Sequence, residues 1–98
     1  MTESTIYNLL LSSGFNVPSF VTFSVNEYVP EIDFFPVALK IESPKVIHKS
    51  DVGGVMLHID SQDDLEMGTI LMRQALASHK VMLDDNDHFL VSSMIEGF

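Results

Sequence analysis

The stretch "PVALKIESPKVIHKSDVGGVMLHI", residues 36–59, decides the predicted fold. It opens with a mostly apolar run, residues 36–43, that predicts a strand. It closes with the alternating run at residues 54–59, which predicts another strand. A long loop joins the two runs, and its glycine pair permits a tight backbone turn. We therefore expect two strands paired like a hairpin across this loop.

The segment before this stretch predicts one helix and one strand. Residues 2–14 carry apolar side chains at helical spacing and finish on a glycine suited to a helix stop. Residues 19–23 are rich in aromatic and β-branched side chains and predict a short strand. Ser24 and Glu27 then have the spacing of a capping box, but Pro30 would interrupt a helix there. Only a short or irregular helix is expected after the first strand.

The segment after the stretch predicts the longest helix and a last strand. Ser61 is expected to cap a helix from residue 63 to about residue 80, and residues 88–94 are expected to form the strand. Helices and strands are thus mixed along 98 residues, which allows a single domain. The prediction is an α+β domain over residues 1–98, with a largely antiparallel sheet of about four strands and two main helices packed on one face.

The composition excludes several classes of protein. The chain has no cysteine, so it has no disulfide framework and no thiolate chemistry. Its net charge of −9 opposes nucleic-acid binding, because phosphate contacts need a basic surface. Its apolar runs are shorter than the roughly 20 residues of a membrane-spanning helix. We expect no targeting leader, no membrane contact and a cytoplasmic location.

Positive charge is nevertheless concentrated in one place. Lys40, Lys45 and Lys49 are three of the five cationic side chains, and they lie beside His48. Backbone N–H groups in glycine turns form concavities that bind anions, so the loop is compatible with a phosphate cradle. Lys40 lies within a strand, on the opposite face from its apolar neighbours. Either it reaches water from an edge strand or it meets a counter-anion, and the pattern leaves both open.

The run "PVALKIESPKVIHKSDVGGVML" resembles the signature of the ATP-grasp domain in ADP-forming acyl-CoA synthetases, including acetate–CoA ligase. The same domain occurs in protein acetyltransferases that resemble these synthetases. The match is nearly continuous over residues 36–55. Residues 9–20 and 89–97 resemble, more weakly, the opening helix of the family and its strand leading to the interlobe hinge. The resemblance implies the N-terminal lobe of an ATP-grasp fold.

The resemblance also implies roles for individual residues. Lys40 would contact nucleotide phosphates. His48 would accept a phosphoryl group from a phosphohistidine of the CoA-binding part and pass it to ADP, which suits imidazole as a nucleophile near pH 7. Four loop residues would stabilise the transferring phosphoryl group: Lys49, Ser50, Gly53 and Gly54. Ser92, Ser93 and Met94 would lie on the adenine side, where the family usually has Gln-Glu-Met.

The resemblance further implies ATP or ADP with Mg²⁺ as ligands. The Mg²⁺ ligands and the CoA-binding and ligase domains would come from a second lobe and other parts, in the same chain or another subunit. The alternative is a non-catalytic remnant that acts as an interaction or regulatory module. Self-association through an uncovered face is a third expectation. A metal site within this chain is not expected, since His58, His79 and His88 are scattered and "DDND", residues 84–87, is typical of a solvated turn.

Overall fold

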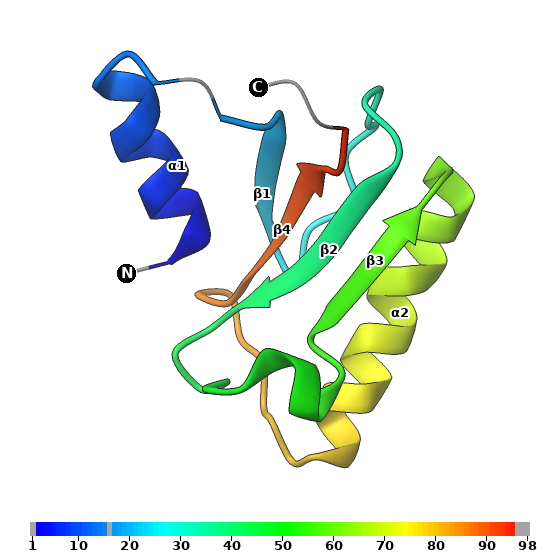
Figure 1. Ribbon diagram of the computed structural model, residues 1–98. Helices are drawn as coiled ribbons and strands as arrows, with labels where there is room; N and C mark the ends of the chain where they lie inside the picture. The colour runs from blue at the N-terminus through cyan, green and yellow to red at the C-terminus, as the bar shows by residue number, and fades with distance from the viewer. Residues whose placement is uncertain (1, 16, 96–98) are drawn as a thin grey trace.

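Four antiparallel strands form the centre of the fold, as the computed structural model of residues 2–15 and 17–95 shows (Figure 1). This arrangement confirms the α+β prediction. The elements in chain order are α1 (Glu3–Ser12), β1 (Phe20–Ser24), β2 (Val37–Glu42), the short 3₁₀ helix η1 (Lys49–Val52), β3 (Val55–Ile59), α2 (Gln62–Ser78) and β4 (His88–Ser93).

The strands lie in the order β1-β4-β2-β3, so β2 is an internal strand. It pairs with β3 on one side, which confirms the predicted hairpin-like pair, and with β4 on the other. Lys40 faces Val55 of β3 and Leu90 of β4 in the two ladders. The interpretation that Lys40 reaches water from an edge strand is therefore wrong.

One face of the sheet forms the main core with α2. Leu39 and Ile41 of β2 are fully buried on this face together with Leu65, Met72 and Leu76 of α2. Each such side chain contributes about 1.5–3 kcal/mol when it leaves water. Ser61 caps α2 as predicted, because its side chain accepts a hydrogen bond from the backbone N–H of Asp64.

The prediction that both helices pack on one face is wrong. Side chains alternate along β2, so Lys40 and Glu42 point away from the core face. These two residues contact Glu3 and Ser4 at the start of α1. Helix α1 therefore lies against the opposite face of the sheet from α2 (Figure 1). The apolar stripe of α1 predicts that the helix packs on the sheet, but it does not predict on which face of the sheet.

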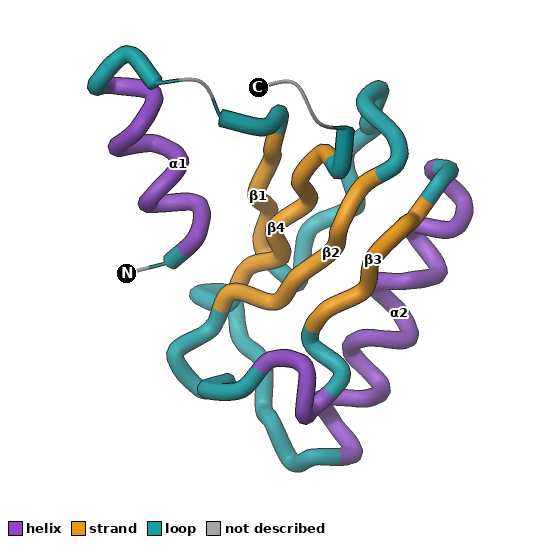
Figure 2. The backbone as a smooth tube through the Cα atoms, in the orientation of Figure 1, coloured by secondary structure: helices purple, strands orange, loops and turns teal. Residues whose placement is uncertain are grey.

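The segment between β1 and β2 contains no helix within residues 25–36, all of which the structure describes. The backbone N–H of Ser24 does bond to Glu27, but the chain then runs as an extended loop. The side chain of Gln62 forms hydrogen bonds with the backbone of this loop. It accepts from the N–H of Ile32 and donates to the carbonyl oxygen of Pro30. A helix appears instead in the next loop, where η1 follows β2 (Figure 2).

Candidate functional site

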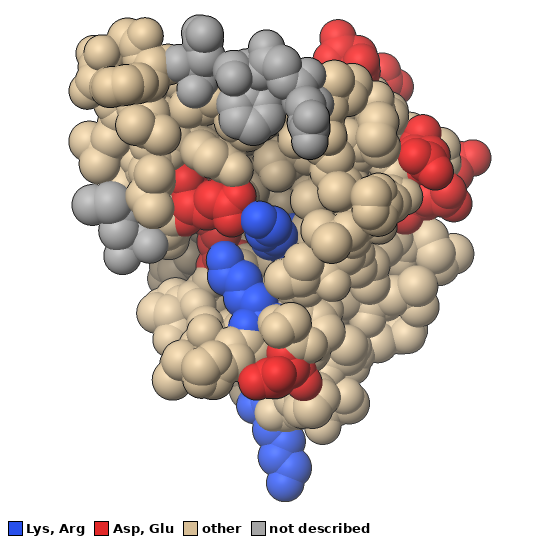
Figure 3. All heavy atoms as spheres, in the orientation of Figure 1, with Lys and Arg blue, Asp and Glu red and all other residues tan. Residues whose placement is uncertain are grey.

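Lys40 stands at the centre of the candidate site and meets a counter-anion. Its Nζ lies 2.8 and 3.0 Å from the two carboxylate oxygens of Glu3, and its side chain is 25% exposed. Burial raises the pKa of Glu3, but hydrogen bonds from Lys40 and Tyr7 and the charges of Lys40 and Lys49 outweigh it and leave the pKa lowered. The carboxylate of Glu3 is thus an anion paired with Lys40. Figure 3 shows acidic and basic atoms side by side on this face of the molecule.

His48 lies in the loop after β2, at the residue before η1, and is exposed. Lys49 and Ser50 begin η1. The loop closes through a hydrogen bond of 2.7 Å from the backbone N–H of Gly54 to the oxygen of Lys49. His48 is therefore open to approach from outside the domain, while the loop that carries it is held at its base.

The two glycines hold this loop against the rest of the fold. Gly53 has φ +78°, and a Cβ on it would lie 2.9 Å from the Cβ of Ala75 in α2. A Cβ on Gly54 would lie 2.5 Å from Cγ2 of Ile41 in β2. The sequence left open whether the glycines serve a turn or a close ligand approach. Their observed contacts are those of a turn pressed against α2 and β2.

Lys45 has a structural partner, which the sequence did not identify. Its Nζ donates to Asp87 at 2.7 Å, to Asp84 at 3.0 Å and to the oxygen of Met82 at 2.7 Å. Asp87 is only 1% exposed, so reading the whole of "DDND" as a solvated turn is wrong at this residue. Burial raises the pKa of Asp87, but hydrogen bonds led by that from Lys45 outweigh it and lower the pKa. Asp87 therefore ties the loop after β2 to the start of β4.

The residues predicted on the adenine side lie at the end of β4. Ser92 is buried on the face that α1 covers and pairs with Phe20, on which Tyr7 packs. Ser93 donates its backbone N–H to the oxygen of Ser19, and the sulfur of Met94 accepts from the N–H of His58.

The structure brings some of the predicted site residues together and separates others. Lys40 and Ser92 share a face, because Lys40 pairs with Leu90 and Ala38 pairs with Ser92. The loop of His48 follows β2 at the end where Glu42 pairs with His88. Ser92 lies toward the other end of the same ladder. Lys40 and Ser92 therefore lie on one sheet face, whereas Ser93, which pairs with Val37 of the core, lies on the other, and the loop of His48 lies past the far end of the ladder.

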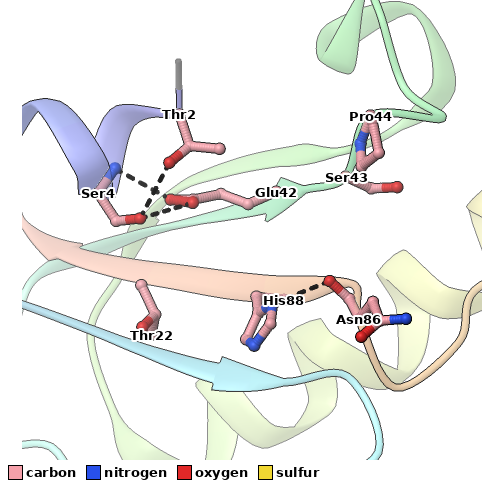
Figure 4. A pocket seen from close by; sticks show the side chains of 8 residues that line it. All are labelled: Thr2, Ser4, Thr22, Glu42, Ser43, Pro44, Asn86 and His88. Atoms are coloured by element: carbon pink, nitrogen blue, oxygen red, sulfur yellow. Dashed lines mark hydrogen bonds between the residues drawn. The ribbon is translucent and has the colours of Figure 1, made fainter.

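A pocket of about 260 Å³ opens beside the first turn of α1 (Figure 4). Glu42, only 7% exposed, accepts from the backbone N–H of Ser4 at 3.1 Å and from its hydroxyl at 2.8 Å. His88 projects from β4 with Nδ1 3.1 Å from the oxygen of Asn86. The residues predicted from the sequence do not line this pocket. Lys49 lines a neighbouring pocket of about 290 Å³ together with Glu42.

Sequence reasoning missed the residues of α1 that complete this face: Glu3, Ser4 and Tyr7. Acidic residues are common in the first turn of a helix. The presence of Glu3 therefore did not indicate an ion pair with Lys40, 37 positions away in the sequence. Within residues 2–15 and 17–95, the structure gathers no group of three or more His, Asp or Glu side chains that could hold a metal ion. In the same ranges, no helix is both long and apolar enough to cross a bilayer.

Known proteins resemble the chain in its sequence. ADP-forming acetate–CoA ligase I of Archaeoglobus fulgidus is 59% identical over 32 residues, which are 33% of this chain and 4% of the ligase. The beta subunit of ADP-forming acetate–CoA ligase II of Pyrococcus furiosus is 48% identical over 40 residues, 41% of this chain and 16% of the subunit. The matches thus span small parts of these relatives.

The fold also has a known counterpart. The structure of dinucleotide forming acetyl-coenzyme A synthetase 1 of Ca. Korarchaeum cryptofilum, in complex with coenzyme A, Ca-AMPCP and HgCl+, superposes with a TM-score of 0.66. It is 24% identical and covers 92% of this chain and 41% of its own, so it supports the fold alone. A family model described as an ATP-grasp domain matches residues 1–98. Since that match takes in every residue, the chain belongs to the ATP-grasp family.

Proposed function

We propose that this domain is the nucleotide-binding lobe of an ADP-forming acyl-CoA synthetase, which makes acyl-CoA, ADP and phosphate from an acid, CoA and ATP. The observation that carries the proposal is the amine of Lys40. It stands on an internal strand, points away from the core and already holds an anion at 2.8 Å. The names of the relatives and the membership of the family support the same function.

In this proposal Lys40 and the η1 loop hold the phosphates of the nucleotide. Lys49 and Ser50 lie at the start of η1, so a positive charge and a hydroxyl donor stand next to His48. Positioning and charge are the main protein contributions to phosphoryl transfer, and these side chains supply both. Ser92, Ser93 and Met94, at the end of β4, form the proposed adenine side, with Ser92 on the same sheet face as Lys40.

His48 is the proposed phosphoryl carrier. In the direction that makes ATP, an imidazole nitrogen of His48 attacks the phosphorus of a phosphohistidine in the CoA-binding part, so that one N–P bond breaks as another forms. A terminal oxygen of ADP then attacks the same phosphorus, and the imidazole of His48 leaves with its electron pair. Acyl-CoA formation runs the same steps in reverse, starting from ATP. The exposure of His48 supports this role, since the group must be reachable from another domain.

Magnesium enters this proposal with the nucleotide, and bound Mg²⁺ would neutralise phosphate charge. The side chains of residues 2–15 and 17–95 do not assemble a carboxylate site for it. Its ligands are therefore assigned to a second ATP-grasp lobe. The CoA-binding and ligase domains are the other proposed partners, in the same chain or as another subunit.

The test combines this domain with the second lobe and the CoA-binding part and measures ATP- and CoA-dependent formation of acyl-CoA. Replacing the nucleophile in His48→Ala should lower turnover by roughly a thousandfold or more. His79→Ala is the matched control, because His79 is also exposed but ends α2. Circular dichroism checks that both variants fold. Full activity in His48→Ala would remove this residue from the mechanism.

A second candidate function is a non-catalytic module that keeps the fold for interaction or regulation. The observation that favours it is that α1 already covers this face: Glu3 pairs with Lys40, and Tyr7 packs on Phe20, which pairs with Ser92. Calorimetric titration with ATP and ADP, with and without Mg²⁺, separates the two candidates. Binding that disappears in Lys40→Ala supports the nucleotide-binding lobe, and absence of binding supports the module.

A further inference from the structure

Helix α1 covers the same face of the sheet that the proposed function assigns to the nucleotide. Its first turn holds Lys40 through Glu3 at 2.8 Å. One turn later, Tyr7 packs on Phe20 with ring centroids 5.0 Å apart, and Phe20 is the β1 residue that pairs with Ser92. The helix thus pairs with the predicted phosphate residue and packs beside a predicted adenine-side residue.

The carboxylate of Glu3 takes the position of a bound anion at Lys40. Both of its oxygens lie within 3.0 Å of the amine, and Lys49 contributes a second positive charge nearby. A phosphate group would use the same two charges. Glu3 and a nucleotide phosphate therefore compete for one amine.

The attachment of α1 to the sheet is weak compared with that of α2. Among the ten residues of α1, all of which the structure describes, none is buried. Ile6, Leu9 and Leu11 are 42%, 51% and 50% exposed. A helix of this length is marginal alone, and a partly exposed ion pair adds only about 0–1 kcal/mol. Polar contacts at the first turn, Glu3 with Lys40 and Ser4 with Glu42, therefore carry much of the docking.

We propose that α1 is a displaceable lid: in the closed form the Glu3 carboxylate holds Lys40 in place of a nucleotide phosphate, and binding of a nucleoside triphosphate releases the helix. This inference rests on the proposed function, because it concerns the regulation of the same site. The measured dissociation constant for the nucleotide is then the dissociation constant of the open form divided by the fraction of molecules in which α1 is released from the sheet. Any change that weakens the closed form raises the apparent affinity.

Calorimetry with Mg-ATP on the full chain tests the lid. Glu3→Gln removes the competing charge and keeps the size of the side chain, so we expect about three- to fivefold tighter binding, the equivalent of one surface ion pair. Glu31→Gln is the matched control, since it removes the same charge at an exposed loop position. Glu3→Gln combined with Lys40→Ala should lose the tighter binding.

Hydrogen exchange with and without Mg-ATP measures the release directly. The amides of α1 should exchange faster when the nucleotide is bound, whereas those of α2 should not. If Glu3→Gln binds no more tightly than the control, or if the amides of α1 exchange more slowly with ATP, the lid is wrong while nucleotide binding stands. If none of the variants nor the natural sequence binds ATP, the proposed function fails and the lid fails with it.

Discussion

At the scale of single residues, Gly54 shows how one missing methyl group positions the candidate site. Its backbone N–H closes the loop on Lys49, and its oxygen accepts from the N–H of Ile41 at 2.9 Å. A Cβ here would lie 2.5 Å from the side chain of Ile41 and 3.1 Å from the oxygen of Lys49. Neither neighbour can move freely, because one is a fully buried core residue and the other is backbone.

Gly54→Ala should therefore destabilise the fold by about 1–3 kcal/mol, the usual cost of an added methyl group in a packed interior. The measurement is the free energy of unfolding from urea denaturation. Gly68→Ala is the control in the same core, where the nearest atom to a new Cβ is the sulfur of Met56 at 3.3 Å. The flexible Met56 can yield, and the helix gains about 1 kcal/mol from alanine. Equal losses in the two variants would contradict this account of Gly54.

The sequence predicted the residue types of the candidate site better than their partners. Lys40, His48 and the glycines were identified because they lie within one short stretch with a recognisable spacing. The alternation of side chains also placed Lys40 on the face away from the core. Its ion pair with Glu3 and the burial of Asp87 depend on contacts 37 and 42 residues apart, which no local pattern encodes.

At the scale of elements, α1 differs most from α2. The bounds of α2 and of the strands agree with prediction to within about two residues, because each has a clear period and turn residues at its ends. The spacing of the apolar residues of α1 predicted the helix, but it did not predict which face of the sheet the helix covers. Which face it covers is decided by Lys40, Glu42 and Phe20, which belong to distant strands.

Tyr7 reports on the docking of α1 through its phenol. Burial, followed by the hydrogen bond to Glu3, raises the pKa of Tyr7 from 10.0 to about 12. A pKa raised in the folded state contributes stability that is present below about pH 10 and is lost as the pH rises through about 12. Alkaline pH should thus detach α1.

The titration is cleanest in Tyr28→Phe, which leaves Tyr7 as the single tyrosine. Ultraviolet absorbance of tyrosinate should then show half-ionisation near pH 12. Adding Glu3→Gln should lower that midpoint, since a neutral partner no longer disfavours the phenolate. A midpoint at 10.0 in Tyr28→Phe would mean that α1 does not dock as described.

At the scale of the whole molecule, acidic repulsion is the dominant long-range charge effect. The net charge is −9, and the principal extents of the described structure are only 39 × 29 × 23 Å. At low salt the Debye length is about 30 Å, so charges interact across most of the fold. Self-repulsion then destabilises the compact state.

Raising the chloride salt from roughly 0.01 M to roughly 1 M should increase Tm, because the Debye length falls to about 3 Å and the repulsion is screened. Thermal unfolding followed by circular dichroism measures the shift. The triple variant Glu31→Gln, Asp60→Asn, Glu66→Gln has a net charge of −9 + 3 = −6 and should respond less. A Tm that falls with salt would show that the ion pairs of Lys40 and Lys45 outweigh the repulsion.

The opposite placement of the two helices gives neighbouring positions of β2 different freedom to change. Val37, Leu39 and Ile41 are locked under α2, where only replacements of similar volume keep the core. Ala38, Lys40 and Glu42 lie on the face that α1 covers. Their side chains are constrained by the contacts made on that face and not by the core. Substitutions at every second residue of β2 could therefore change the surface that α1 contacts without repacking the interior.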